Sequence, residues 1–283
     1  MAKGNLLLGT AGNSVGDVVM YRREGAQVSR VRVRKIKNPK TDAQSLQRAA
    51  FSPVAKFYSP LAVVLERSFE GLSKMKSYNK FLKTNIDLAR ANGWLLPKGT
   101  GFFPLPYKLS QGTLPSVPVS FDSGNVAFEV DIPIGEGATN TVGSLSTQLI
   151  NAGYQAGDIV TIIMVKGNDV TPRGEYIPFT LQFEIDTTST ATLASLSTQI
   201  SIDITNGEFS INVNNGTACA AAVIVARFEN DKWRRSSQFL VVTSTLISAI
   251  EATAYKEAAI ASYGMNAGDP NPLVYLDGDT LEG

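Results

Sequence analysis

Hydrophobic and polar residues alternate near the start of the chain, which is typical of β-strands. Apolar runs at residues 4–9 and 17–22 flank a glycine-, serine- and asparagine-rich stretch, residues 10–16, that predicts a turn. In the next run, residues 27–34, Ser or Val alternates with Arg from residue 29 onward. One face of a strand would therefore carry all the arginines of this run. Residues 23–26 (Arg-Glu-Gly-Ala) predict the turn of a hairpin that joins these runs.

The pattern changes to helical spacing after an Asn-Pro dipeptide, because a residue before proline avoids the helical conformation. Thr41 followed by Gln44 fits a capping box at a helix start. Pro53 and Pro60 each follow a serine, which is the arrangement of an N-cap with proline at the first helical position. We therefore expect two or three short helices rather than one long one, and a further helix over residues 77–91 that ends at an Asn-Gly pair.

Short β-type runs fill most of the second part of the chain. They are rich in Val, Ile, Phe and Thr and occupy residues 126–130, 159–165, 176–185, 199–204, 209–213, 221–228 and 238–243. Their spacing is typical of an antiparallel sandwich. Before them, residues 97–118 concentrate proline, glycine and serine and predict a linker. An alanine- and serine-rich segment, residues 246–261, predicts one more helix.

The predicted fold class is α+β, with four parts along the chain. Residues 1–96 form a basic β-hairpin and short helices, and residues 97–118 form the linker. Residues 119–245 form a mainly antiparallel β-sandwich or jelly-roll-like domain, and residues 246–283 form a helix and an acidic tail. The length of 283 residues and the hydrophobic content of 43% are enough for a substantial core.

The composition gives no support for catalysis. Histidine is absent, which removes the commonest general base and zinc ligand. The single cysteine, Cys219, lies among alanines and is expected to be a small buried side chain. Glu184 and Asp186 would share one face of a strand, where a solvated face explains them best. We therefore predict no enzyme, no catalytic residue, no cofactor and no metal site.

No targeting segment is evident in the sequence. The first apolar run is interrupted by glycine after three leucines, and no apolar run reaches the roughly 20 residues that a bilayer requires. We expect synthesis in the cytoplasm without a signal peptide and no membrane association. A surface or carbohydrate-binding module, which would need export, is a weaker interpretation.

Charge is divided by position along the chain. Residues 1–100 hold 18 Lys and Arg against 6 Asp and Glu, a net charge of +12, and residues 101–283 hold 8 against 19, a net charge of −11. The densest basic cluster comprises Arg22, Arg23, Arg30, Arg32, Arg34, Lys35, Lys37, Lys40 and Arg48. A smaller basic patch, Lys232, Arg234 and Arg235, surrounds Trp233, whose indole is expected to pack on the sheet while the charges face a partner.

Two interpretations of the basic cluster stay open. Such clusters bind nucleic-acid backbones by Coulomb attraction and counterion release, largely without reading sequence. The same charges could equally face a neighbouring acidic subunit, because the second part of the chain is itself acidic.

Four segments carry a resemblance to a known family. These are residues 1–5, 15–19, 38–48 and 231–238, of which the third has the pattern Asn-Pro-x-Thr-x-x-Gln-x-x-Gln-Arg. They resemble an uncharacterised family of Bacteroidota bacteria and their phages and mobile elements. The function of that family is unknown, so the resemblance implies a lineage and an organisation but no chemistry.

The sequence leads to two hypotheses of function. The first is a non-enzymatic structural protein that self-assembles as a bacteriophage virion component, in a capsid or tail, with homo-oligomers or other virion proteins as partners. Its basic N-terminal region would face nucleic acid or a neighbouring subunit. The alternative is a cytoplasmic protein that binds nucleic acid without sequence preference.

Overall fold

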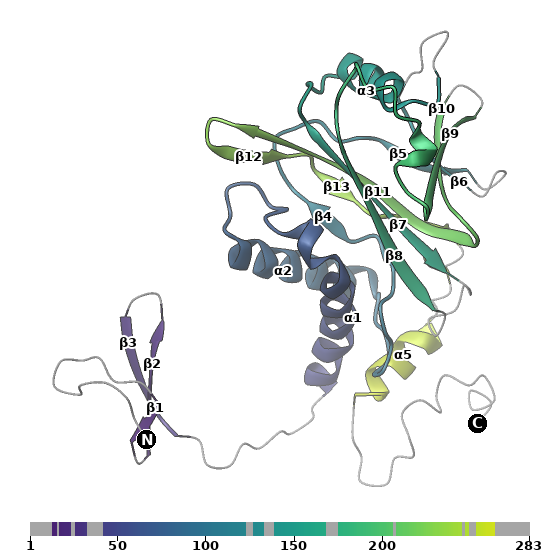
Figure 1. Ribbon diagram of the computed structural model, residues 1–283. Coiled ribbons are helices and arrows are strands. Elements are labelled where there is room, and N and C mark those ends of the chain that lie inside the picture. The colour runs from purple at the N-terminus through teal and green to yellow at the C-terminus, as the bar shows by residue number, and fades with distance from the viewer. Residues whose placement is uncertain are drawn as a thin grey trace. The chain divides into compact units, whose positions relative to one another are not determined.

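The chain folds as two compact units, residues 1–40 and residues 41–283. The computed structural model describes residues 13–15, 17–23, 26–32, 42–122, 127–132, 139–167, 175–205, 208–244, 247–248 and 253–263. Figure 1 shows the helices and the antiparallel sheets that these residues form. The predicted α+β fold class is confirmed.

The first unit is a sheet of three antiparallel strands. They are β1 (Asn13–Val15), β2 (Val18–Arg23) and β3 (Ala26–Val31). Arg23 pairs with Ala26, so the predicted hairpin is confirmed. The prediction of a turn over residues 10–16 is wrong for residues 13–15, because these residues form strand β1 and Ser14 pairs with Val19.

Helix α1 (Asp42–Leu65) corrects the prediction of short helices, because it runs 24 residues through Pro53 and Pro60. A proline at position 53 cannot donate to the carbonyl of Ala49. That carbonyl instead accepts a hydrogen bond from the amide of Leu96 at 3.3 Å. Seven buried side chains recur at helical spacing along α1: Ala49, Ala50, Val54, Phe57, Tyr58, Leu61 and Leu65. Tertiary packing therefore outweighs the local cost of the prolines.

Helix α2 (Lys74–Asn92) confirms the helix predicted near residues 77–91. Its C-cap, Gly93, has a φ of 68°, a left-handed conformation that favours glycine, as the Asn-Gly pair indicated. Phe81, Ile86 and Ala89 on its buried side join α1 in the first hydrophobic core.

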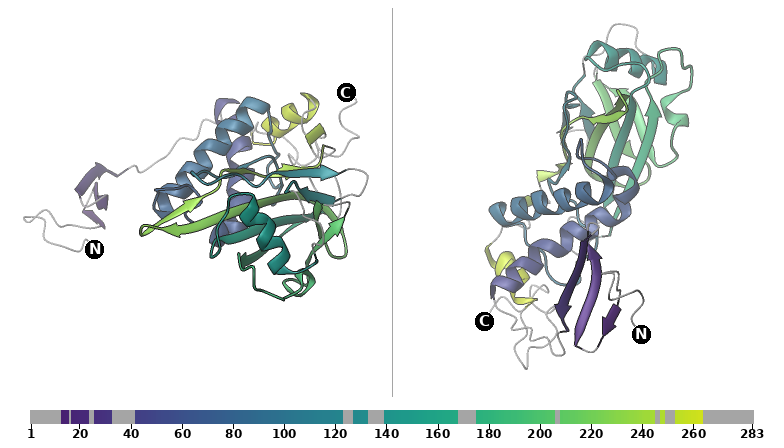
Figure 2. Two further views of the ribbon diagram at one scale, coloured as in Figure 1. Left: turned by 90° about the horizontal axis from the view of Figure 1, so that it is seen from above. Right: turned by 90° about the vertical axis from the view of Figure 1, so that its left-hand side faces the viewer.

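A five-stranded antiparallel sheet lies at the centre of the second unit. Its strands are β7 (Ile159–Gly167), β8 (Tyr176–Glu184), β11 (Thr217–Glu229), β12 (Lys232–Arg235) and β14 (Val241–Val242). The order is β12-β11-β7-β8, with β14 paired to β11. Figures 1 and 2 show α1 and α2 beside this sheet. One face of β11, with Ala220, Ala222 and Ile224, packs into their core.

The other face of the central sheet belongs to a β-sandwich. A second antiparallel sheet, of order β5-β6-β10-β9, is built from β5 (Val119–Asp122), β6 (Ala127–Val130), β9 (Ile200–Thr205) and β10 (Glu208–Val213). Phe128 and Phe209 of this sheet share a second hydrophobic core with Val223 and Val225 of β11. All seven predicted β runs overlap strands, and the described sheets do not close into a barrel.

Helix α3 (Val142–Asn151) covers this second core and lies where no helix was predicted. The Thr141 hydroxyl accepts a hydrogen bond from the Ser144 amide at 3.2 Å, which caps the helix. The short 3-10 helix η2 (Leu193–Ser195) and helix α5 (Thr253–Ala261) are further helices of this unit. Helix α5 lies within the segment where a C-terminal helix was expected.

Residues 97–118 are packed into the second unit. They contain the buried side chains Phe103, Leu105 and Tyr107 and the strand β4 (Lys108–Ser110), which pairs with β13 (Gln238–Phe239). Residues 97–118 thus help to build the first core, and the division between the two compact units falls at residue 40. None of the described helices is long and apolar enough to cross a membrane.

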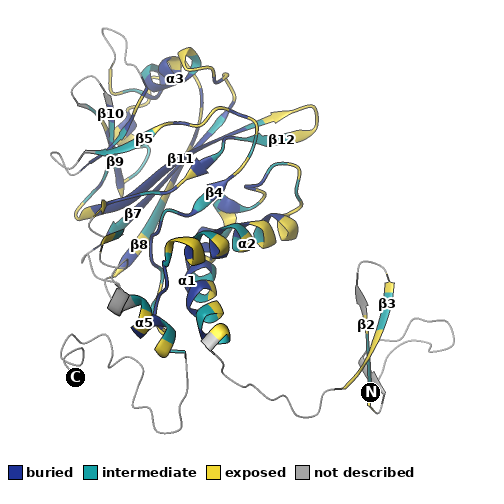
Figure 3. Cartoon of the chain, turned by 180° about the vertical axis from the view of Figure 1, so that it is seen from behind, coloured by how far each residue is buried: buried dark blue, intermediate teal, exposed yellow. Residues whose placement is uncertain are grey.

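Most of the buried apolar residues lie in the two hydrophobic cores (Figure 3). Burial also determines the reactivity of the Cys219 thiol. This side chain lies in β11 and is 2% exposed. Burial raises the pKa of its thiol to about 11. The expectation of a buried, unpaired cysteine is confirmed.

Cys219 should consequently be inert in the folded protein. At pH 8 about one thousandth of such a thiol is ionised, and the thiolate is the reactive form. We expect an aromatic disulfide reagent, followed by absorbance, to label Cys219 only after the protein is unfolded in guanidinium chloride. Rapid stoichiometric labelling of the native protein at pH 8 would contradict the buried position.

Candidate functional site

The first unit presents two arginines on one face of its sheet. Arg30 and Arg32 are exposed and two residues apart, so they extend to the same side, as the alternation predicts. Arg30 pairs with Val19 across the sheet, and its guanidinium carbon lies 5.9 Å from the centre of the Tyr21 ring. The exposed face therefore combines cationic groups with an aromatic ring.

The structure places only part of the predicted basic cluster together. Arg22 and Arg23 lie in β2, next to β3, which contains Arg30 and ends one residue before Arg32. Arg48 lies in α1, which is in the second unit, and is partly buried. The remaining members lie outside the described residues: Arg34, Lys35, Lys37 and Lys40.

The smaller basic patch lies on the hairpin that β11 and β12 form at one end of the central sheet. Glu229 pairs with Lys232, which leaves a two-residue turn. Both turn residues, Asn230 and Asp231, have positive φ angles of 52° and 58°. Asn and Asp tolerate this conformation, which the tightest hairpins require. The hairpin thereby carries β12 to the edge of the sheet.

Trp233 contacts aromatic and cationic neighbours on this hairpin. Its ring centre lies 5.2 Å from that of Phe228, which is 59% exposed, and the guanidinium carbon of Arg235 lies 5.3 Å from the Trp233 ring. Burial and the nearby Arg67 lower the pKa of Arg235. Its Nε is buried and makes no hydrogen bond to any part of the chain that the structure describes.

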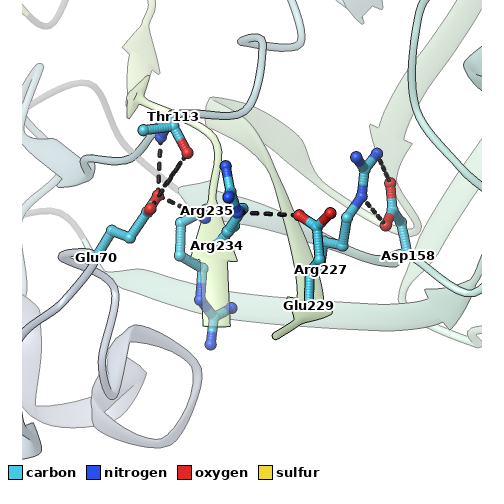
Figure 4. A network of polar contacts seen from close by, with 7 residues as sticks. All are labelled: Glu70, Thr113, Asp158, Arg227, Glu229, Arg234 and Arg235. Atoms are coloured by element: carbon cyan, nitrogen blue, oxygen red, sulfur yellow. Dashed lines mark hydrogen bonds and ion pairs between the residues drawn. The ribbon is translucent and has the colours of Figure 1, made fainter. Parts of the chain in front are cut away.

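Polar contacts fix the hairpin against its surroundings (Figure 4). Glu70, from the connection between α1 and α2, accepts hydrogen bonds from the amide of Thr113 at 2.8 Å and the amide of Arg235 at 3.3 Å. Glu229 pairs with Arg234 at 3.0 Å. The contacts of Glu70 join three segments that are far apart in the sequence, so no local pattern could have revealed them.

A groove with a volume of about 950 Å³ lies beside β12. Its walls come from the hairpin, from residues 69–72, from residues 111–113 and from Lys80 of α2. Gly112 brings one wall close to β12, because a Cβ there would lie 2.1 Å from the carbonyl oxygen of Arg235. Lys232, Trp233 and Arg234 line the groove, so the predicted smaller patch borders a concave surface.

Acidic groups form no metal centre in the described part of the chain. No three His, Cys, Asp or Glu side chains there are arranged to hold a metal ion. Glu184 and Asp186 are both exposed. Hydrogen bonds from the hydroxyl and amide of Thr188 lower the pKa of Asp186, so its carboxylate serves a local turn.

The comparisons with known proteins bear on the first part of the chain. Residues 9–94 match the sequence model of a family of unknown function (DUF6266). The match covers residues 9–40 of the first unit together with α1 and α2, so it includes the basic cluster but not the sandwich. The resemblance to a family of unknown function is confirmed for this region, and the lineage stays a prediction. No curated protein and no solved structure matches the chain.

One buried ion pair holds the hairpin to the core. The Nε and Nη2 of Arg227 donate to the two carboxylate oxygens of Asp158 at 2.8 and 2.7 Å. The side chains are only 15% and 2% exposed, and the carboxylate also accepts from the amide of Gln155 at 2.9 Å. This bidentate pair joins the residue before β7 to Arg227, near the end of β11.

Asp158→Asn should destabilise the protein by about 3 kcal/mol, because it leaves a guanidinium buried without its counter-charge. The measurement is the free energy of unfolding in urea. Lys74→Gln removes an exposed pair with Glu66 and provides the control, with an expected loss below about 1 kcal/mol. Equal losses in the free energy of unfolding for the two variants would show that burial does not increase the contribution of the Asp158 ion pair to stability.

Proposed function

We propose that this protein is a non-enzymatic structural subunit that assembles with further copies of itself, as the subunits of a bacteriophage capsid or tail do. The observation that carries the proposal is the composition of the first unit. It is a small sheet in which Arg30 and Arg32 are exposed and no side chain of residues 17–21 and 26–32 is buried. Such a sheet is suited to contact another molecule.

The apolar side chains of the first unit support an interface. Val31 is 73% exposed and Tyr21 is 40% exposed, and Val18, Val19 and Met20 are only half-buried. A small sheet is marginally stable unless a hydrophobic face is covered. Tyr21 and Val19 share the face of Arg30, so a partner on that face would bury them as well as pair the arginines, while Val18, Met20 and Val31 lie on the opposite face.

The second unit offers a complementary surface. On the outer face of the sheet β5-β6-β10-β9, cross-strand pairing places Ser120, Glu129, Ser210 and Asp203 in one row. The four strands contain no Lys or Arg. Glu129 and Asp203 are two strands apart, about 10 Å, and Arg30 and Arg32 are about 7 Å apart along their strand. Long side chains can bridge that difference, so the basic hairpin of one copy fits the acidic face of the next.

Charge reversal on each surface tests the assembly. The wild type should form oligomers at low salt that dissociate as ionic strength rises from about 0.05 to 0.5 M. Arg30→Glu/Arg32→Glu and Glu129→Arg/Asp203→Arg should each be monomeric, because each loses one side of the contact. An equimolar mixture of the two should assemble again, because the reversed hairpin of one variant is complementary to the reversed row of the other and the unreversed surfaces also match. Sedimentation velocity distinguishes these states.

The matched control is Glu175→Arg/Glu257→Arg, which reverses two exposed carboxylates outside the acidic row and should assemble as the wild type does. Circular dichroism establishes that each variant is folded. A wild-type protein that stays monomeric at low salt and high concentration would overturn the proposed function. Oligomers that persist in both reversed variants would overturn this choice of surfaces.

Nucleic-acid binding is the second candidate function, and the grouping of Arg30 and Arg32 with Tyr21 favours it. It predicts that labelled duplex DNA is bound by the wild type and by Glu129→Arg/Asp203→Arg, whereas Arg30→Glu/Arg32→Glu loses binding. Affinity should fall steeply with salt, because phosphate contacts release counterions. Fluorescence anisotropy gives both results. Equal affinity of wild type and the arginine variant would reject this function.

A further inference from the structure

The outer edge of β12 is only partly covered. Beyond the end of this strand, Leu114 forms a parallel bridge with Ser236, and its amide donates to the carbonyl of Arg235 at 3.0 Å. The amide of Arg235 donates to Glu70 on the same side. Both main-chain groups of Arg235 thus point away from β11 and are satisfied by the chain itself.

Trp233 lies two residues before Arg235, so its amide and carbonyl point to the same outer side. That side is the groove. Here the wall formed by residues 111–113 leaves room beside the strand, and β12 is the last strand in the order of the sheet. Within the described residues, no strand pairs with the outer edge of β12 at Trp233.

The charges around this edge are unevenly compensated. The two carboxylates of the groove are engaged internally, Glu70 by Thr113 and Glu229 by Arg234. Lys80 and Lys232 line the groove and are exposed. No described carboxylate lies within ion-pair distance of either lysine. The uncompensated charge of the groove is positive.

We propose that this groove binds an extended acidic peptide segment, which adds as a strand to the outer edge of β12 at Trp233. The main chain of the segment would pair with the amide and carbonyl of Trp233, and its carboxylates would face Lys80 and Lys232. An unpaired strand edge matches the alternating donors and acceptors of a peptide, which neither a phosphate backbone nor a bilayer supplies. The site is independent of the contact proposed for assembly and lies within the second unit.

The probe is a synthetic octapeptide of alternating Val and Glu, titrated into the full-length chain. Binding is followed by the fluorescence of Trp233, because the other tryptophan, Trp94, is 8% exposed and does not line the groove. We expect saturable binding that weakens as salt rises. A Val-Gln octapeptide should bind at least tenfold more weakly. A Val-Glu octapeptide with alternate N-methylated amides should also lose at least tenfold, because it cannot complete the strand pairing.

Lys80→Glu/Lys232→Glu should weaken binding of the acidic octapeptide at least tenfold. Lys76→Glu/Lys83→Glu, which makes the same change of charge at two exposed lysines of α2 outside the groove lining, should bind as the wild type does. Circular dichroism and the free energy of unfolding in urea confirm that the variants are folded.

Three results would overturn the proposal. The first is the absence of binding up to about 1 mM peptide. The second is equal affinity for the acidic and neutral peptides, which would show that the lysines do not recognise the carboxylates. The third is equal affinity for the N-methylated peptide, which would remove strand addition. None of these results depends on the oligomeric state, so the proposed assembly can fail or succeed separately.

Discussion

The second unit depends on the burial of β11 on both of its faces. Alternate residues of this strand enter different cores: Ala222 and Ile224 pack with the helices, and Val223 and Val225 pack inside the sandwich. A shift of register by one residue would exchange the two sets. The strand must therefore be apolar throughout its buried length, and the small alanines allow a helix layer and a second sheet to approach it closely.

The same strand determines where the exposed chemistry lies. β11 is 13 residues long, and its last residues pass beyond both cores, where burial ends. Arg227 marks that boundary, because its ion pair with Asp158 is the last largely buried contact on the strand. Beyond it, Phe228 and Glu229 are exposed, and the tight turn returns the chain as the edge strand β12. The hairpin that lines the groove thus forms because β11 extends beyond the two cores.

Local pattern in the sequence was enough to predict most of the strands, the N-terminal hairpin and helix α2, because alternation, a glycine C-cap and turn residues act over a few positions. It failed for α1, where a carbonyl freed by Pro53 finds its donor in Leu96, more than 40 residues away. It also missed α3, whose serine and glycine content hides the cap at Thr141. The basic patch around Trp233 was found, but the groove was not, since Glu70 and Lys80 come from the helical region.

The division of charge along the chain has a structural counterpart in the way each unit is stabilised. The second unit buries two cores and needs no partner to cover them, so its charged groups can stay at edges and on the outer sheet. The first unit has no described side chain that is buried, and a small sheet of this kind gains little stability from its own contacts. Any molecule that covers its apolar residues stabilises the sheet in proportion to the affinity of binding. Under the proposed assembly, folding and binding are coupled in the first unit and separate in the second. Arg30 of β3 and the following Arg32 then lie where electrostatic attraction guides a contact that apolar burial completes.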